Sequence, residues 1–357
     1  MFRKHSIVLL AAIGSFICSS LCTKAQDQQD EIVRVKTRVV FIDTLVIDRT
    51  TGMPVGDLTR ENFEVRADGK PRELSYFSRA GEGRRRPLAI LLVVDLVSHD
   101  SEEYRRRADV LKSLAAAFQK LSAEDEVAVF ANLGGHGAQL KTLSDFTRDR
   151  RKITEALVAV QTLPMPQASW YRDELDNVLK IAEDAAAKRR DSQIIVITLS
   201  IPFGRMRFSE RDKIVDRLIR INAMFSPLIR EVGAGSIKIH NVPGKVPTPP
   251  KPVFATIGRL TGTDFYAPGH IAERTGGDAT IVRQPEDYGA ALEKFVASLA
   301  ARYNLGFTLK ESEQDDGRMH KLEVRIRARD SKGKDRKLVA RARHGYYLKR
   351  PEAPVEK

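Results

Sequence analysis

Residues 90–101 read ILLVVDLVSHDS, a run of large aliphatic residues that ends at Asp95 and continues into a polar stretch. A continuous apolar run of this kind is typical of a parallel β-strand that is buried on both faces of its sheet. The carboxyl ends of such strands form the edge at which α/β proteins bind their ligands. The stretch therefore predicts a buried strand of an α/β domain and places the Asp95 carboxylate at that edge.

Helical and strand patterns alternate after Asp95, as they do in parallel sheets that helices cover on both faces. The expected helices cover residues 102–121, 148–161, 171–188, 269–277 and 285–304, and a further helix that begins at residue 208 leads into the strand near 220–226. The expected strands cover residues 125–132, 139–147, 192–200, 220–226 and 278–283. Gly276 and Gly277 predict the C-cap of one helix, and Pro285 is placed to start the last helix. The stretch 233–252 is rich in Gly and Pro and predicts an excursion or loop.

Both ends of the mature chain have the alternating pattern of β-strands. Residues 31–80 include a predicted hairpin with its turn at Asp68-Gly69, and residues 303–348 alternate apolar and polar residues again. Each segment has few residues with which to build a core of its own. We expect the two segments to pair into one small β-sandwich around the inserted α/β domain. The predicted boundaries are 1–25 for a signal peptide, 26–86 for the N-terminal β-rich segment, 87–302 for the α/β domain, 303–348 for the C-terminal β segment and 349–357 for a tail.

The first 25 residues have the organisation of a secretory signal peptide. A basic region from Arg3 to His5 precedes an apolar region from Ile7 to Leu21, and Thr23-Lys24-Ala25 offers small residues for cleavage. An uncleaved membrane anchor is the alternative, although a spanning helix needs roughly 20 apolar residues. No other stretch is long and apolar enough to span a membrane. We therefore expect export to the periplasm or the extracellular space.

Cleavage of this signal changes the chemistry of the chain. It removes both cysteines, Cys18 and Cys22, and with them disulfides and thiol catalysis. Acylation of Cys22 is a minor alternative, because Leu21 stands where lipoprotein signals have Gly or Ala. Cleavage also removes three basic residues and lowers the formal charge from +13 to +10. The remaining basic residues are mixed with acidic ones, so we expect a solvated surface, no nucleic-acid partner, and only a salt-dependent attraction to an anionic envelope.

The order of these features resembles the secreted bacterial VWFA-related family of the acidobacterial type. The N-terminal match runs from Val46 to Lys70 and includes ENFEVRADGK. The other matching stretches are LLVVD (91–95), DFTRD (145–149), AERTGGDATIV (272–282), RYNLGFTLK (302–310) and VARARHGYY (339–347). The resemblance covers nearly all of the mature chain. It implies a Rossmann-like von Willebrand factor A domain with a role in adhesion or protein interaction.

The resemblance also implies a Mg²⁺ site, because A domains hold this ion with oxygen ligands from three loops. Asp95 matches the first loop, but Val97 and His99 stand at the positions of two serine hydroxyls. Ser169 falls near the threonine of the second loop, and Leu199 replaces the aspartate of the third. We therefore expect a degenerate motif and no cofactor. A remodelled metal site resting on Asp95 and Ser169 is the open alternative.

The same three loops form the expected interaction face. Its residues are Asp95, Ser98, His99, Asp100, Ser101, Ser169, Trp170 and Asp173, with a third loop at 199–205. Trp170 is the only tryptophan and has two interpretations, a binding anchor or a side chain that caps the edge of the sheet.

Catalytic motifs are missing from the sequence, which has no GxSxG, HExxH, P-loop or GxGxxG after a strand. The histidines His240, His270, His320 and His344 are scattered and expected at the surface. We therefore expect a non-enzymatic, metal-independent interaction protein that binds a protein or cell-envelope partner through the loop face. A structural or assembly module of an envelope complex is the alternative, and a hydrolase is the third hypothesis.

Overall fold

Strand β5 (Leu88–Asp95) lies in the middle of a six-stranded sheet in the computed structural model of the protein. The structure describes residues 38–79, 82, 85–96, 107–134, 139–164, 171–201, 206–230, 263–264 and 266–348. No side chain of β5 is more than 8% exposed. β5 is therefore buried along its whole length, as its apolar run predicts.

The strand order of this sheet is β12-β10-β8-β5-β6-β7. The other strands are β6 (Glu126–Asn132), β7 (Leu140–Thr147), β8 (Gln193–Ile201), β10 (Met224–Arg230) and β12 (Thr280–Val282). All neighbours are parallel except β6 and β7, which are antiparallel. In chain order the strands lie as 3-2-1-4-5-6, which is the doubly wound Rossmann order. The predicted Rossmann-like α/β fold with a mostly parallel sheet is confirmed.

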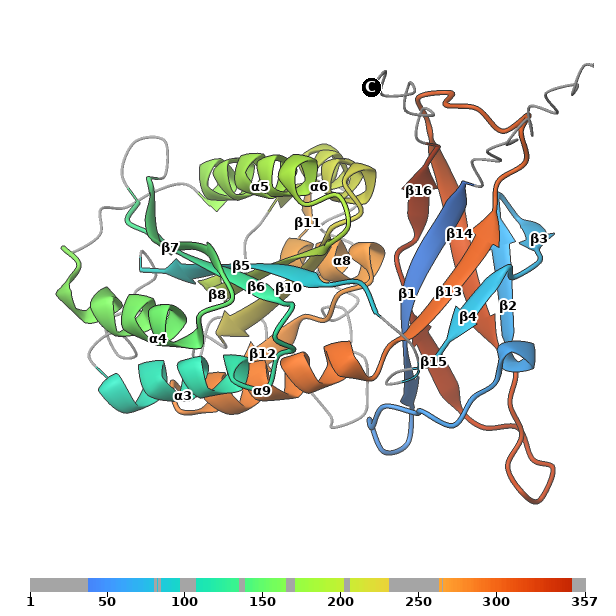
Figure 1. The fold of residues 1–357 in the computed structure, drawn as a ribbon, viewed down its shortest axis with the longest axis horizontal. Helices are drawn as coiled ribbons and strands as arrows, with labels where there is room; N and C mark the ends of the chain where they lie inside the picture. The colour runs from blue at the N-terminus through green and yellow to red at the C-terminus, as the bar shows by residue number, and fades with distance from the viewer. Residues whose placement is uncertain are drawn as a thin grey trace, which may run out of the picture. The chain divides into compact units, whose positions relative to one another are not determined.

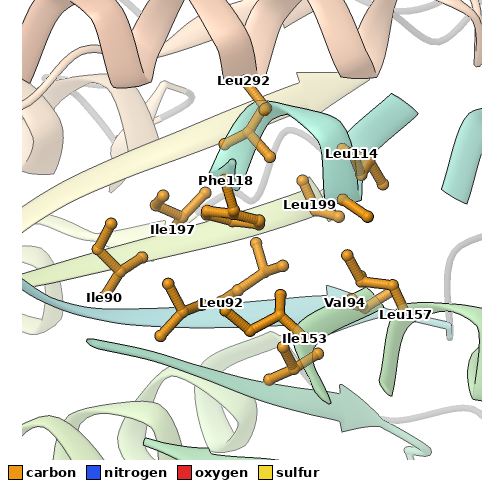
Figure 2. Close-up of a cluster of buried hydrophobic side chains, with 14 of the residues drawn as sticks. Ile90, Leu92, Val94, Leu114, Phe118, Ile153, Leu157, Ile197, Leu199 and Leu292 are labelled. Carbon is orange, nitrogen blue, oxygen red and sulfur yellow. The ribbon is translucent and has the colours of Figure 1, made fainter. Parts of the chain in front are cut away.

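Helices cover both faces of the sheet (Figure 1). One layer comprises α3 (Ala108–Phe118), α4 (Arg150–Ala159) and α9 (Asp287–Ala300), and the other comprises α5 (Tyr171–Lys188), α6 (Phe208–Arg220) and α8 (Ala267–Thr275). Alternate side chains of β5 face the two layers. Ile90, Leu92 and Val94 pack with α3, α4 and α9 (Figure 2), whereas Leu91 and Val93 pack with α5, α6 and α8.

Two matching stretches of the sequence set helix ends. Asp149, the last residue of DFTRD, is the N-cap of α4, and its carboxylate accepts from the backbone N–H of Arg151 at 2.9 Å. Gly276 ends α8 in the left-handed region with φ 80°, as its position predicts. A Cβ at Gly277 would lie 1.9 Å from the carbonyl oxygen of Phe225, so this close approach to β10 requires glycine.

Several elements differ from their expected bounds. Helix α9 ends at Ala300 instead of residue 304, because Ala301 leaves the helical conformation and β13 begins at Tyr303. The described helix α3 begins at Ala108, because Arg107 before it is extended. Strand β10 begins at Met224 instead of residue 220, because α6 continues through Arg220 and Asn222 turns the chain with φ 54°. Asparagine tolerates this left-handed conformation better than most residues do.

The two ends of the chain form a β-sandwich of two four-stranded sheets (Figure 1). One sheet has the order β15-β1-β13-β4 and the other β16-β14-β2-β3. The strands are β1 (Val39–Asp48), β2 (Phe63–Ala67), β3 (Lys70–Arg72), β4 (Tyr76–Ser78), β13 (Tyr303–Thr308), β14 (Met319–Ile326), β15 (Leu338–Arg341) and β16 (Gly345–Tyr347). Each sheet combines N-terminal and C-terminal strands, so both segments bury a shared core, as expected. The exact domain boundaries stay a prediction.

The remaining short elements are η2 (Arg60–Asn62), η3 (Val160–Thr162) and a two-stranded ladder of β9 (Met206–Arg207) and β11 (Thr263–Asp264). The β2–β3 hairpin turns at Asp68 and Gly69, with φ 49° and 77°, as predicted.

His320 does not lie at the surface, and its surface prediction is wrong. It is 6% exposed on β14, and its Nδ1 lies 2.8 Å from the carboxylate of Asp68 in the hairpin turn. Its ring stacks on Tyr346. Cross-strand packing inside the sandwich buries this histidine, and the flanking residues of the sequence give no sign of it.

The sandwich and the helix-covered sheet belong to one compact unit. Three of the matching stretches meet where they join. Arg302, which follows α9, donates from Nη2 to the carbonyl oxygen of Gly276 at 2.9 Å. Arg341 on β15 forms an ion pair with Asp278 at 2.5 Å. The stretches 272–282, 302–310 and 339–347 therefore hold the joint between the two parts together.

Tyr303 of the C-terminal segment bonds to the N-terminal segment of the sandwich, to residues at least 245 positions away in the sequence. Its hydroxyl donates to the carbonyl oxygen of Val55 at 2.8 Å and accepts from the backbone N–H of Leu58 at 3.1 Å. The side chain is fully buried. We predict that Tyr303→Phe lowers the free energy of unfolding in urea by about 1–3 kcal/mol, because it leaves buried backbone groups unsatisfied.

Tyr76→Phe is the matched control, because Tyr76 is exposed and, among the described residues, its hydroxyl reaches only Ser78 Oγ, at 3.4 Å. It should change stability by less than about 0.5 kcal/mol. Equal losses in the two variants would contradict the role of the Tyr303 hydroxyl.

Candidate functional site

Asp95 ends β5 at the carboxyl edge of the sheet, opposite Asn132 at the end of β6. Asn132 Nδ2 donates to Asp95 Oδ1 at 3.2 Å, and Asn132 Oδ1 accepts from the backbone N–H of Gly134 at 3.0 Å. Asp95 is only 2% exposed. The carboxylate is therefore part of a buried hydrogen-bond network that connects the ends of two neighbouring strands.

The structure does not test most of the predicted interaction face. Ser98, His99, Asp100, Ser101, Ser169 and Trp170 lie outside the described residues. Asp173 is on the first turn of α5, and its side chain is outside the described part as well.

Asn132 is the residue that sequence reasoning missed at this edge. It is the polar end of the second buried strand, as Asp95 is of the first. Adjacent parallel strands bring such ends together. The polar residues at the ends of the two buried strands are therefore the sequence signal that could have identified Asn132.

Leu199, assigned to the third loop, lies inside β8 and not in a loop. It is 1% exposed, and Figure 2 shows it in the apolar cluster with Leu114 and Leu292. The expectation that it takes part in an interaction loop is wrong, because β8 continues to Ile201. Residues 202–205 lie outside the described part. The adjacent Thr198 is fully buried, and its Oγ1 makes no hydrogen bond within the described residues.

The described residues of these loops do not fit a Mg²⁺ site. They offer one carboxylate, Asp95, whose Oδ1 is engaged by Asn132, and an apolar side chain at Leu199. Magnesium requires several convergent oxygen ligands. Within the described ranges, no three His, Cys, Asp or Glu residues lie close enough to hold a metal ion. Metal independence itself stays a prediction.

A second polar cluster surrounds Asp264 on β11, and the sequence analysis did not find it. The buried Asp264 carboxylate accepts from Arg211 Nη1 on α6 at 2.9 Å and lies 2.7 Å from His270 Nδ1 on α8. The backbone N–H of Tyr266 donates to its other oxygen at 2.8 Å. The His270 side chain is half-buried. The cluster joins β11 to α6 and α8.

Burial raises the pKa of Asp264, but His270, through its hydrogen bond and charge, and the bond from Arg211 outweigh this effect. The pKa of Asp264 consequently lies below its ordinary value of 3.8. The carboxylate is ionised at neutral pH and acts as the anion of a buried ion pair.

An aspartate that orients a histidine also occurs in catalytic triads, in which the histidine is the general base. The other ring nitrogen of His270, Nε2, has no hydrogen-bonded hydroxyl among the residues the structure describes. The contacts of Asp264 with Arg211 and His270 fix α8 against α6 and β11.

Comparisons with known proteins give structural likenesses only. No protein-family model matches the chain, and no curated protein matches its sequence. A von Willebrand factor type A structure from Catenulispora acidiphila is 10% identical, covers 87% of this chain and 75% of its own, and has a TM-score of 0.41. The SpRpn10 VWA domain is 12% identical, covers 58% of this chain and 93% of its own, and has a TM-score of 0.36.

The human COPII-coat protein Sec24c is 9% identical with a TM-score of 0.40. The match covers 75% of this chain but 44% of Sec24c, so the chain spans less than half of that protein. At such TM-scores and identities, none of the three bears on what this chain binds.

We predict that Asp95→Ala lowers the free energy of unfolding in urea by about 1–3 kcal/mol, because it leaves the buried amide of Asn132 without this acceptor. Asp95→Asn keeps an oxygen at the same place and should lose clearly less. Equal losses in both variants would show that the negative charge is required, as it would be beside a bound cation.

We also predict that Asp264→Asn costs about 3 kcal/mol at pH 7, since it breaks a buried ion pair. Asp212, a half-exposed second partner of Arg211, gives the control, and Asp212→Asn should cost less than about 1 kcal/mol. Because folding lowers the pKa of Asp264, its stabilisation is complete above pH 3.8 and is lost as the pH falls further. Urea unfolding between pH 7 and pH 3 measures the difference, and a deficit of Asp264→Asn that stays constant below pH 3.8 would contradict the assignment.

Proposed function

We propose that this chain is an exported, non-enzymatic protein of the interaction or adhesion type, whose von Willebrand factor A-like domain binds its partner without a metal ion. Its partner is a protein or a component of the cell envelope. The surface proposed for binding is the carboxyl edge of the six-stranded sheet, where α/β folds bind their ligands. Membership of the acidobacterial VWFA-related type belongs to the same proposal and rests on the matching stretches of sequence.

The position of Leu199 carries this proposal. In the family pattern an aspartate of the third loop supplies an oxygen at this point, and here a leucine is buried in the core with Leu114 and Leu292. The Asp95 carboxylate is buried and accepts a hydrogen bond from Asn132. A surface that has lost oxygen ligands in this way can still bind through shape and apolar contacts, which need no ion.

Export is supported by the signal-like residues 1–25, which lie outside the described residues. Within the described part of the chain, no helix is long and apolar enough to cross a membrane. The positive charge of the chain would add a salt-dependent attraction to an anionic envelope.

The alternative function, a structural or assembly module of an envelope complex, is favoured by one feature of the sandwich. Phe41 on β1 and Tyr76 on β4 lie edge to face at 5.4 Å across Gly306 of the intervening strand β13, and both are 37% exposed. Exposed aromatic residues of this kind often mark binding surfaces. A partner docked here would use the sandwich and not the sheet edge.

Partner capture from an envelope extract with the full chain tests the proposal. We expect equal recovery of the same partner in EDTA and in Mg²⁺. Trp170→Ala should reduce that recovery about tenfold or more, the loss expected for an interface anchor. Tyr76→Ala is the aromatic control on the sandwich and should leave recovery unchanged. Calorimetry with Mg²⁺ and Mn²⁺ should show no saturable heat and no rise in melting temperature.

Other outcomes separate the alternatives. Saturable Mg²⁺ binding together with loss of the partner in EDTA would overturn metal independence. Recovery that depends on Tyr76 or on residues 238–252, and not on Trp170, would move the assignment to the assembly module.

A further inference from the structure

A cavity of about 280 Å³ lies at the amino-terminal edge of the six-stranded sheet, where it joins the sandwich. Leu88 and Met224, at the starts of β5 and β10, line it together with Leu299 of α9. Asp43 of β1 and Arg302 line it from the sandwich side. The cavity is thus at the opposite edge of the sheet from Asp95 and separate from the proposed interaction face.

Arg302 is a buried cation with incomplete hydrogen bonding. It is 5% exposed, and its Nη2 donates to the carbonyl oxygen of Gly276. Its Nε and Nη1 have no hydrogen-bond partner among the described residues. Burial lowers the pKa of Arg302 to about 10, so the guanidinium is still charged at neutral pH. A buried charge with unmade hydrogen bonds is costly unless an anion accompanies it.

Further arginines near the cavity increase the excess of positive charge. Arg86 lines it and donates to the carbonyl oxygens of Asp191 and Ser192, with no carboxylate partner in the described part of the chain. Arg343 is half-buried, and its Nη2 donates to the carbonyl oxygen of Phe41 at 2.8 Å. Desolvation lowers the pKa of Arg343 to about 10, the charge of Asp43 opposes that effect, and the charge of Arg86 adds to it.

The acids near these arginines do not balance them. The negative charge of Asp43 raises the pKa of both Arg302 and Arg343. Asp278 also acts on Arg302 but is already paired with Arg341. The other two lining arginines are matched, since Arg85 bonds Asp125 and Arg79 lies 3.6 Å from Glu82. Arg302 and Arg343 therefore share Asp43, Arg86 adds a third positive charge, and among the described residues this group lacks negative charge.

The lining of the cavity indicates the class of anion that would supply this charge. Leu88, Met224 and Leu299 form an apolar side that an inorganic anion would leave unused. Guanidinium groups bind carboxylates with paired hydrogen bonds. Small-molecule sites combine an apolar wall with a few polar groups in this way.

We propose that the cavity binds a small organic carboxylate, with the carboxylate on Arg302 and Arg86 and the aliphatic body on Leu88, Met224 and Leu299. The carboxylate belongs either to a free aliphatic acid or to the C-terminus of a peptide. Either source adds the missing negative charge at the joint between the sandwich and the sheet. The site is independent of the proposed partner surface.

The full chain with hexanoate as the probe tests the proposal through the melting temperature and calorimetry. Hexanoate should raise the melting temperature in a saturable way, and hexanol at the same concentrations should not. Acetyl-Ala-Ala-Leu with a free and with an amidated C-terminus forms the second arm. A shift with hexanoate alone identifies a free acid, and a shift with the free-terminus peptide alone identifies a peptide terminus. No saturable shift in either arm, or an equal shift with hexanol, would overturn the proposal.

Variants of the charged residues test the assigned contacts. Arg302→Gln and Arg86→Gln should each weaken binding of the effective probe about tenfold or more. Arg86→Gln carries the test if Arg302→Gln does not fold. Asp43→Asn should strengthen binding severalfold, because it removes the competing carboxylate, an effect that a purely structural cluster would not show.

Arg217→Gln is the matched control, since this arginine pairs with Asp176 and Glu183 between α5 and α6, away from the cavity. It should bind the probe as the unmodified chain does. Unchanged affinity in the Arg86 and Asp43 variants, or equal losses in the Arg217 control, would refute the site.

Discussion

The burial of β5 is the constraint on which the rest of this structure depends. The strand has a parallel neighbour on each side and a helical layer on each face, so none of its side chains is more than 8% exposed. Such a strand tolerates polar groups only at its ends. The carboxyl end holds Asp95 against Asn132, and the amino end opens on a cavity lined with arginines. Both candidate sites are consequences of one apolar strand.

The sandwich depends on the helix-covered sheet in turn, because it is built from the two ends of the chain. Neither end has enough apolar side chains to bury alone, and their strands pair in both sheets. The sheet between them holds the two ends near each other. Arg302 and Arg341 then connect the sandwich to the end of α8 and the start of β12. Several stretches that resemble the VWFA-related family thus lie at this joint and not at the carboxyl edge of the sheet.

The two edges of the sheet have different chemistry. At the carboxyl edge the described residues offer a hydrogen-bonded Asp95 and a buried leucine, and they do not assemble the oxygen ligands of an ion site. At the amino edge an excess of guanidinium groups surrounds a cavity, and such groups favour an anion. The partner surface that we propose lies at one edge and the carboxylate site that we propose lies at the other, and the sandwich contributes to the second site only.

The sequence by itself determined the fold class, because apolar periodicity and turn residues act locally. The run before Asp95, the Asp68-Gly69 turn and the Gly276 cap all appear where their patterns predict. Tertiary structure alone decided which polar residues meet. Asn132 joins Asp95 through the alignment of two strands, and Asp264 joins Arg211 from 53 positions away. The cavity beside Arg302 depends on strands from both ends of the chain, because charge excess is a property of residues brought together by folding and not of any single stretch.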